Sequence, residues 1–207
     1  MSEPAKPMDF KVLGKILNAI GETSKNIYYP SDDSFLILSA ISELALEGRK
    51  VLDVGTGSGL LGLYCAMRGA IVTIADIDEM AIRHAVDAAE KLGVTVNANV
   101  SDVFSNVVGQ FDLVLFNPPY LPSRLISDKA VDGGLKGRNL IERFLRDLPK
   151  HLERHGTALL VVSSLNESTS LIEAHPEFRL SIEKKRSLFF EELQVLSLRF
   201  REDFTAQ

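Results

Sequence analysis

The sequence predicts an α/β fold built on a seven-stranded, mostly parallel sheet that ends in an antiparallel hairpin. Three observations predict it. Strand and helix patterns alternate from Lys50 onward, as in βαβ units joined by right-handed crossovers. A glycine-rich segment joins the first of these strands to its helix. The last two strand-like runs, 178–183 and 192–200, have no long helical pattern between them, so we expect them to pair as a hairpin.

Two helices are expected before the sheet begins. Apolar residues recur at helical spacing from Phe10 to Ile20, and Gly21 can end that helix. The segment Ser31-Asp32-Asp33-Ser34 is typical of a cap before a second, strongly apolar helix over residues 35–46. Residues 1–7 contain two prolines and little apolar material, so we expect a loose tail there. A length of 207 residues is enough for one domain, and we expect residues 1–207 to form one.

The elements of the sheet follow in order. The expected strands are residues 51–54, 71–75, 94–100, 111–116 and 157–163, followed by the hairpin. The expected helices are residues 59–68, 79–92, 139–152 and 167–174. The strand from Val94 to Val100 alternates apolar and polar residues, which is typical of a strand with one exposed face.

Composition limits the class of protein. Hydrophobic residues make up 45% of the chain and charged residues 25%, which is ordinary for a soluble globular protein. No apolar run is long enough to span a membrane, and the first residues lack a signal-peptide core. The single Cys65 excludes an internal disulfide framework, and the four histidines have no partners at metal-ligand spacing. We therefore expect a cytoplasmic protein without a metal site.

Charge argues against one class of partner. The net charge is −5, which disfavours tight non-specific binding to nucleic acid because such binding depends on neutralising phosphates. A local basic patch is still compatible with that value. The only basic triplet is Lys184-Lys185-Arg186, which we interpret as a solvated strand end or turn.

The most informative motif is Asn117-Pro118-Pro119-Tyr120, directly after the apolar run 111–116. Two prolines cannot continue a strand, so the strand must stop there, at the end that faces the ligand crevice in a parallel sheet. The Asn117 oxygen and the Pro118 carbonyl can accept the two hydrogens of a planar NH2 group, while Tyr120 stacks on its plane. The alternative is a Pro-Pro loop that merely ends a strand. We predict Asn117, Pro118, Pro119 and Tyr120 to be the catalytic residues.

A glycine loop follows the first strand. Gly55, Gly57 and Gly59 permit a tight turn and close approach of the backbone to a ligand. The G-x-G-x-x-G pattern that begins at Gly57 also fits a nicotinamide or flavin cofactor, with Asp76 at the distance expected of a ribose ligand. Asp53 argues against that reading, because a carboxylate beside the loop repels a diphosphate and suits an ammonium group.

Acidic residues also follow the next two strands. Asp76 ends the second strand and can accept both ribose hydroxyls of an adenosine, whereas Asp78 is better placed to cap the following helix. Asp102 follows the third strand, where it could accept an adenine amino group or simply serve the turn. Val103 and Phe104 could flank the adenine ring or belong to the core.

Taken together, these motifs resemble those of the class I S-adenosylmethionine-dependent methyltransferases, which have a Rossmann-like fold. The resemblance extends from Tyr28 to Phe200, and the Asn-Pro-Pro-Tyr motif narrows it to two groups. These are the adenine-N6 nucleic-acid enzymes and the protein glutamine enzymes of the HemK type. The matching residues are Asp53-Val54-Gly55-Thr56-Gly57-Ser58-Gly59, Asp76, Ser101-Asp102 and Asn117-Pro118-Pro119-Tyr120.

Two further stretches are similar to the short eukaryotic and archaeal release-factor glutamine methyltransferases. Residues 29–36 resemble their Tyr-x-Pro-x-Glu-Asp-Thr-Phe-Leu stretch, with Asp32 in place of Glu and Ser34 in place of Thr. Residues 132–138, followed by Phe144, resemble their Gly-Gly-x-x-Gly-Arg segment. The resemblance implies S-adenosyl-L-methionine as cofactor and the glutamine of a Gly-Gly-Gln motif in a peptide chain release factor as substrate.

The resemblance also implies a partner and a set of cofactor-binding residues. The partner is a small zinc-binding activator protein that covers the sheet edge at Val94 to Val100, although Asn97 and Asn99 could simply solvate that edge. The predicted cofactor-binding residues are Tyr29, Asp33, Ser34, Asp53, Gly55, Thr56, Gly57, Gly59, Asp76, Ile77, Asp102, Val103 and Asn117. Two alternatives remain. One is an adenine-N6 methyltransferase acting on RNA or DNA, with Tyr120 stacking on a flipped base. The other is a non-catalytic cofactor-binding subunit.

Overall fold

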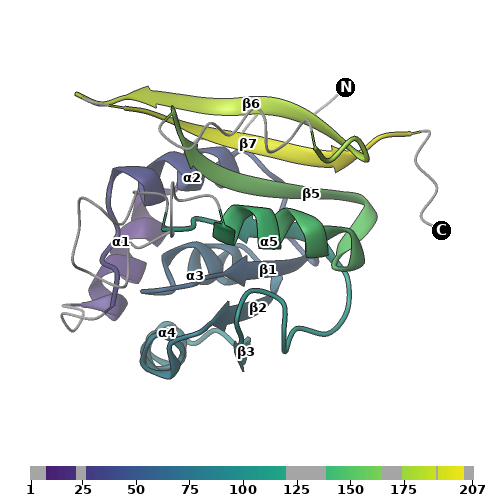
Figure 1. The fold of residues 1–207 in the computed structure, drawn as a ribbon. Helices are drawn as coiled ribbons and strands as arrows, with labels where there is room; N and C mark the ends of the chain where they lie inside the picture. Colours follow the sequence, from purple (N-terminus) through teal and green to yellow (C-terminus); the bar gives the residue numbers. More distant parts are fainter. Residues whose placement is uncertain (1–7, 22–26, 120–138, 165–173, 190, 203–207) are drawn as a thin grey trace.

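The computed structural model describes residues 8–21, 27–119, 139–164, 174–189 and 191–202. Its centre is a seven-stranded sheet in the order β3-β2-β1-β4-β5-β7-β6 (Figure 1). The strands are β1 (Lys50–Val54), β2 (Ile71–Asp76), β3 (Val96–Val100), β4 (Phe111–Phe116), β5 (Leu152–Ser163), β6 (Phe178–Ser187) and β7 (Glu192–Phe200). β1 to β5 are parallel, and β7 runs antiparallel to both β5 and β6. The predicted sheet and its closing hairpin are confirmed.

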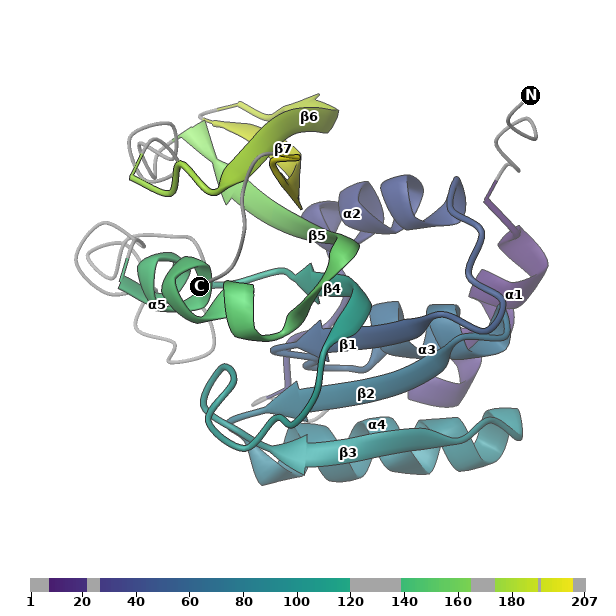
Figure 2. The same ribbon diagram turned by 90° about the vertical axis from the view of Figure 1, so that its right-hand side faces the viewer.

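Helices cover both faces of this sheet (Figure 2). They are α1 (Phe10–Ile20), α2 (Asp32–Ser42), α3 (Leu60–Met67), α4 (Glu79–Leu92) and α5 (Asn139–Asp147). α1 to α4 lie on one face and α5 on the other, so the sheet has two apolar cores. Alternate residues of β1 show the division, because Val51 packs into the first core and Leu52 into the second. A strand buried on both faces explains the continuous apolar run at this position.

The first two helices begin at side-chain caps. Asp9 accepts hydrogen bonds from the backbone N–H groups of Lys11 and Val12, and α1 ends before Gly21 as predicted. α2 begins at Asp32, earlier than predicted, because Ser31 and Ser34 form a reciprocal capping box that starts the helix directly after Ser31. It ends at Ser42, also earlier than predicted, although the apolar sequence pattern continues to the buried Leu46.

The connection from α5 to β5 corrects a second prediction. The helix was expected to reach residue 152, but it stops at Asp147 because Pro149 lacks a backbone N–H and forces a short 3-10 turn. β5 then starts at Leu152 rather than 157. Gly156 permits this early pairing, since a Cβ there would lie 2.9 Å from the backbone oxygen of Phe111. The helix predicted over 167–174 falls almost wholly outside the described residues.

The close contact between α3 and the sheet depends on Gly62. A Cβ at this position would lie 2.8 Å from Ile74 Cγ2 and 3.1 Å from Asp53 Oδ2, both in the strands beneath. Gly14 in α1 is a matched control, because a Cβ there would meet nothing within 4 Å. Both glycines are helical, so only the neighbouring atoms distinguish them.

We expect Gly62→Ala to destabilise the fold by about 1–3 kcal/mol through overpacking. Gly14→Ala should stabilise it by about 0.5–1 kcal/mol, because alanine loses less backbone entropy on folding. Urea denaturation of the two variants and the parent measures both changes. A stabilisation by Gly62→Ala equal to that of Gly14→Ala would contradict the close contact.

Candidate active site

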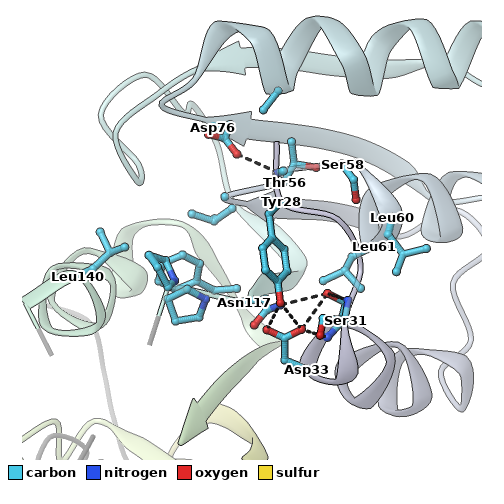
Figure 3. A pocket seen from close by; sticks show the side chains of 18 of the residues that line it. Tyr28, Ser31, Asp33, Thr56, Ser58, Leu60, Leu61, Asp76, Asn117 and Leu140 are labelled. Atoms are coloured by element: carbon cyan, nitrogen blue, oxygen red, sulfur yellow. Dashed lines mark hydrogen bonds between the residues drawn. The ribbon is translucent and has the colours of Figure 1, made fainter. Parts of the chain in front are cut away.

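A cavity of about 940 Å³ opens at the carboxyl ends of β1, β2 and β4. Its wall combines the start of α2, the glycine loop after β1, the turns after β2 and β3, the Asn-Pro-Pro segment after β4 and the β6–β7 hairpin. Figure 3 shows Asp76 toward one end of this cavity, with Tyr28, Asp33 and Asn117 grouped toward the other.

The glycine loop takes a conformation that requires glycine. Gly55 and Gly57 have φ values of +65° and +52°, in the region that residues with side chains rarely adopt. The backbone N–H groups of Gly55 and Thr56 both donate to the Ala75 carbonyl, and that of Gly57 donates to Asp76 Oδ2 at 2.9 Å. The loop is therefore held against β2, and it forms the floor of the cavity.

Asp76 lies where the sequence predicted a ribose ligand. Its Oδ2 accepts from Gly57 and its Oδ1 from the backbone N–H of Asp78 at 2.9 Å. Each carboxylate oxygen keeps a further lone pair for a hydroxyl donor. Burial raises the pKa of Asp76, against the effect of these hydrogen bonds. Next to it, Ile77 is 70% exposed on the cavity wall and presents an apolar surface to a ligand. Asp78 caps α4 as expected.

Asp53 lies behind the glycine loop, where it binds the first turn of α3. Its carboxylate is 1% exposed, and its Oδ2 accepts from Thr56 Oγ1 at 2.7 Å and from the Gly62 backbone N–H at 2.9 Å. Burial raises the pKa of Asp53 to about 6, and the nearby charge of Asp76 adds to this rise. Asp53 does not belong to the cavity wall, whereas Thr56, which donates a hydrogen bond to Asp53, does. Asp53 would therefore act on a ligand through Thr56.

Two other predicted residues also lie off the wall. Gly59 permits helix packing, since a Cβ there would lie 2.9 Å from the Cβ of Ala85 in α4. Tyr29 is 51% exposed, whereas the preceding Tyr28 lines the cavity. Pro30 restricts Tyr29 to an extended conformation, in which neighbouring side chains point in opposite directions. From the sequence alone, this effect of Pro30 could have indicated that only one of the two tyrosines, Tyr28 or Tyr29, faces the cavity.

The turn after β3 carries backbone strain beside the cavity. Within the described ranges, Val103 is the only non-glycine residue with positive φ, at +53°, which is costly for a β-branched side chain. Asp102 lines the same wall, and its Oδ2 forms an ion pair with Arg143 at 2.6 Å. Phe104 turns away and stacks on His151 with ring centres 4.5 Å apart, so it belongs to the core.

The segment after β4 holds the most informative polar group. Asn117 Nδ2 donates to Ser34 Oγ at 3.5 Å. Its Oδ1 is buried at the cavity, without a hydrogen-bond partner among the residues that the structure describes. Pro118 and Pro119 complete this wall, while Tyr120 falls outside the described residues. A buried acceptor without a donor costs about 1–3 kcal/mol, so this end of the cavity suits a ligand that donates an N–H.

The cavity wall is acidic. Its ionisable acidic residues are Asp32, Asp33, Asp76, Asp78, Asp102 and Glu191. No lysine, arginine or histidine belongs to this wall among the described residues. A diphosphate would meet only repulsion from these carboxylates, which argues against a dinucleotide. A ligand with an adenosine, an ammonium group and a sulfonium, as in S-adenosylmethionine, fits both the charge and the donor set.

Comparison with known proteins decides the family. The methyltransferase small domain family matches residues 31–186. The chain belongs to this family. A putative protein N5-glutamine methyltransferase of Methanocaldococcus jannaschii is 36% identical over 181 residues, which cover 83% of this chain and 90% of that protein. Human methyltransferase HEMK2 is 29% identical over 179 residues, which cover 79% of this chain and 80% of the human protein.

Solved structures of methyltransferases have the same fold as this chain. The Mtq2–Trm112 complex of E. cuniculi matches with a TM-score of 0.70 and 23% identity, over 85% of this chain and 99% of that chain. A 16S rRNA N2 methyltransferase (RsmC) of T. thermophilus, solved with AdoMet and guanosine, matches with a TM-score of 0.67 and 23% identity, over 84% of this chain and 44% of that chain. The protein is an S-adenosylmethionine-dependent methyltransferase with a class I, Rossmann-like fold.

The structure thus collects most of the predicted cofactor residues on one wall. Those that line the cavity are Asp33, Ser34, Gly55, Thr56, Gly57, Asp76, Ile77, Asp102, Val103 and Asn117. Of these, Asp76 would hold the ribose, and Ile77 and Val103 would flank the adenine. The individual contacts remain predictions, as do roles for Tyr29, Asp53 and Gly59. Sequence reasoning missed Tyr28 and also Glu191, which enters the wall from the hairpin and accepts a hydrogen bond from Ser163.

We expect Asp76→Asn to weaken S-adenosylmethionine binding about tenfold or more, because it removes a charged acceptor for the ribose and loosens the loop at Gly57. Isothermal titration calorimetry measures the change. Asp87→Asn is the control, because Asp87 is exposed on α4 and lies outside the cavity wall. Equal affinity in the two variants would refute the ribose assignment.

Asp53 should also leave a signature in the pH dependence of stability. Its pKa is 3.8 in the ordinary state and about 6 in the folded protein. Between these values the folded protein binds more protons than the unfolded chain, so stability falls as pH rises from 4 to 6. Relative to Asp53→Asn, the free energy of unfolding should drop by about 2 kcal/mol across that window. Parallel profiles from urea denaturation of parent and variant would contradict the raised pKa.

Proposed function

We propose that this enzyme methylates the side-chain nitrogen of the glutamine in the Gly-Gly-Gln motif of a peptide chain release factor. The observation that carries the proposal is the buried Asn117 Oδ1, an acceptor without a described partner at the strand end of the methyltransferase cavity. A primary amide supplies the donor that this oxygen lacks. The proposal also draws on relatives named protein N5-glutamine methyltransferase and release factor glutamine methyltransferase.

The chemistry demands positioning more than a strong base. The lone pair of an amide nitrogen is delocalised into its carbonyl, so the nitrogen is a poor nucleophile. Hydrogen bonds from its NH2 group to Asn117 and to the Pro118 carbonyl would hold it in place and favour a localised lone pair. When bound, S-adenosylmethionine would supply an electrophilic methyl carbon on sulfur. One N–C bond would form as one C–S bond breaks, and the nitrogen would then release a proton to solvent. Fixed geometry can contribute up to roughly 7–11 kcal/mol to such a reaction.

The charges near the site favour a protein substrate over a nucleic acid. The cavity wall is acidic, and the one basic triplet is engaged in ion pairs. These pairs are Lys184 with Glu43, Lys185 with Glu192, and Arg186 with Asp32. Binding RNA or DNA requires free cations to neutralise phosphates. An adenine amino group has the same planar NH2 chemistry, so RNA serves as the competing substrate in the test below.

A small activator protein at the β3 edge belongs to the same proposal. β3 (Val96–Val100) is an edge strand, and Val100 is 45% exposed. An edge strand with unpaired backbone groups is a surface on which another chain can pair. The relative from E. cuniculi was solved as a complex of Mtq2 with Trm112. That the partner binds zinc rests only on the family resemblance.

Asn117→Ala should abolish methyl transfer to a release factor while changing cofactor affinity less than about threefold, because in the proposed mechanism Asn117 Oδ1 binds the acceptor nitrogen and holds it for transfer. The assay follows tritiated methyl groups from the cofactor to a release factor, with and without the activator, and uses bulk RNA as the competing substrate. Calorimetry of the same variant reports cofactor binding.

The matched control is a release factor with the Gly-Gly-Gln glutamine changed to glutamate, which keeps the shape and removes the NH2 group. Label that is lost with this change supports the proposed substrate. Label on RNA alone would move the assignment to nucleic-acid methylation. Equal turnover by Asn117→Ala and the parent would remove Asn117 from the mechanism.

A further inference from the structure

We propose that Tyr28, Asp33 and Ser34 form a positioning relay that fixes the Asn117 carboxamide with its oxygen toward the substrate. This inference rests on the acceptor role of Asn117 in the proposed function, and not on which protein is methylated. Figure 3 shows Tyr28, Asp33 and Asn117 together at the end of the cavity away from Asp76, and Ser34 lines the same cavity.

The relay begins at a buried carboxylate. Asp33 is 4% exposed, and Tyr28 Oη donates to both of its oxygens at 2.9 Å. The backbone N–H and the hydroxyl of Ser34 also donate to Asp33 Oδ1, the hydroxyl at 3.1 Å. Burial and the adjacent Asp33 charge raise the pKa of Tyr28 well above its usual range, so its hydroxyl stays a donor. Three donor groups, the Tyr28 hydroxyl and the N–H and hydroxyl of Ser34, therefore converge on this carboxylate.

The direction of the next hydrogen bond follows from this charge. A serine hydroxyl has one proton, and in Ser34 that proton points to Asp33. The Ser34 oxygen is left as an acceptor, and it accepts from the backbone N–H of Ser31 at 3.4 Å and from Asn117 Nδ2 at 3.5 Å. Only the NH2 end of a carboxamide can donate.

Asn117 is therefore held with Nδ2 toward Ser34, and its Oδ1 is left for the substrate. The reversed amide would bring two acceptor oxygens together and would direct its NH2 group at the substrate NH2. A donor in that place could not hold the acceptor nitrogen. The charge on Asp33 thus selects the productive orientation of Asn117, two hydrogen bonds away.

The relay also changes what Asp33 and Ser34 are expected to do. Both line the cavity and were predicted from sequence to bind the cofactor. Their hydrogen bonds run instead among themselves and to Tyr28, Ser31 and Asn117. Loss of the Ser34 hydroxyl should then reduce the rate of methyl transfer more than the affinity for the cofactor.

The first test compares Ser34→Ala with Ser34→Thr, which keeps the hydroxyl. Ser42→Ala is the matched control, because Ser42 is a buried serine of the same helix that lies off the cavity wall, and its hydroxyl donates to the Ser39 carbonyl within α2. We expect kcat to fall about tenfold in Ser34→Ala, with the cofactor Kd changed less than about twofold. Ser34→Thr should restore the rate. A weakened cofactor Kd with unchanged kcat would overturn the relay.

The second test needs no substrate. The side-chain NH2 resonances of Asn117 can be assigned in an NMR spectrum by their loss in Asn117→Asp. We expect the hydrogens to exchange slowly with solvent in the parent, and roughly tenfold faster in Ser34→Ala, because a hydrogen bond protects them. Equal exchange in both would overturn the relay. Since this readout is independent of turnover, a release factor that is not methylated would contradict only the proposed substrate.

Discussion

The site depends on two carboxylates, the half-buried Asp76 and the buried Asp53, which accept hydrogen bonds from backbone N–H groups across the ends of parallel strands. Asp76 holds Gly57 of the loop after β1, and Asp53 holds Gly62 in the first turn of α3. Together these bonds fix the loop between β1, β2 and α3, and they leave its open side to the cavity. Neither carboxylate has a described basic partner, so burial raises the pKa of both. The fold thus accepts an electrostatic cost in order to hold the cofactor loop in one conformation.

The electrostatic cost of these carboxylates, which have no described basic partner, is compatible with a positively charged ligand. An acidic wall is unfavourable for phosphates but attracts a molecule that carries an ammonium and a sulfonium, and binding such a cation offsets part of the repulsion among the carboxylates. The same G-x-G-x-x-G spacing that serves dinucleotides elsewhere is therefore compatible with a different cofactor. The charged residues that surround the glycine loop in space, rather than the glycines themselves, distinguish a site for S-adenosylmethionine from a site for a dinucleotide.

The sequence predicted those parts of the molecule that local rules decide. α4 and β4 match their predicted bounds because a cap, a periodic apolar face and a Pro-Pro stop each act within a few residues. The predicted end of α5 and the predicted start of β5 were wrong, because Pro149 and the close approach at Gly156 overrode the apolar pattern. The bond between Ser34 and Asn117 joins residues far apart in the chain, and no single-sequence rule could supply it. For the same reason Tyr28 was missed.

The two ends of the cavity use charge in different ways. At the cofactor end Asp76 can touch the ligand directly, whereas at the transfer end Asp33 is separated from Asn117 by a hydroxyl. A carboxylate in direct contact with the acceptor amide could accept its hydrogens in more than one geometry. Through Ser34, the same charge acts only by orienting a neutral carboxamide, which has one acceptor and a fixed plane.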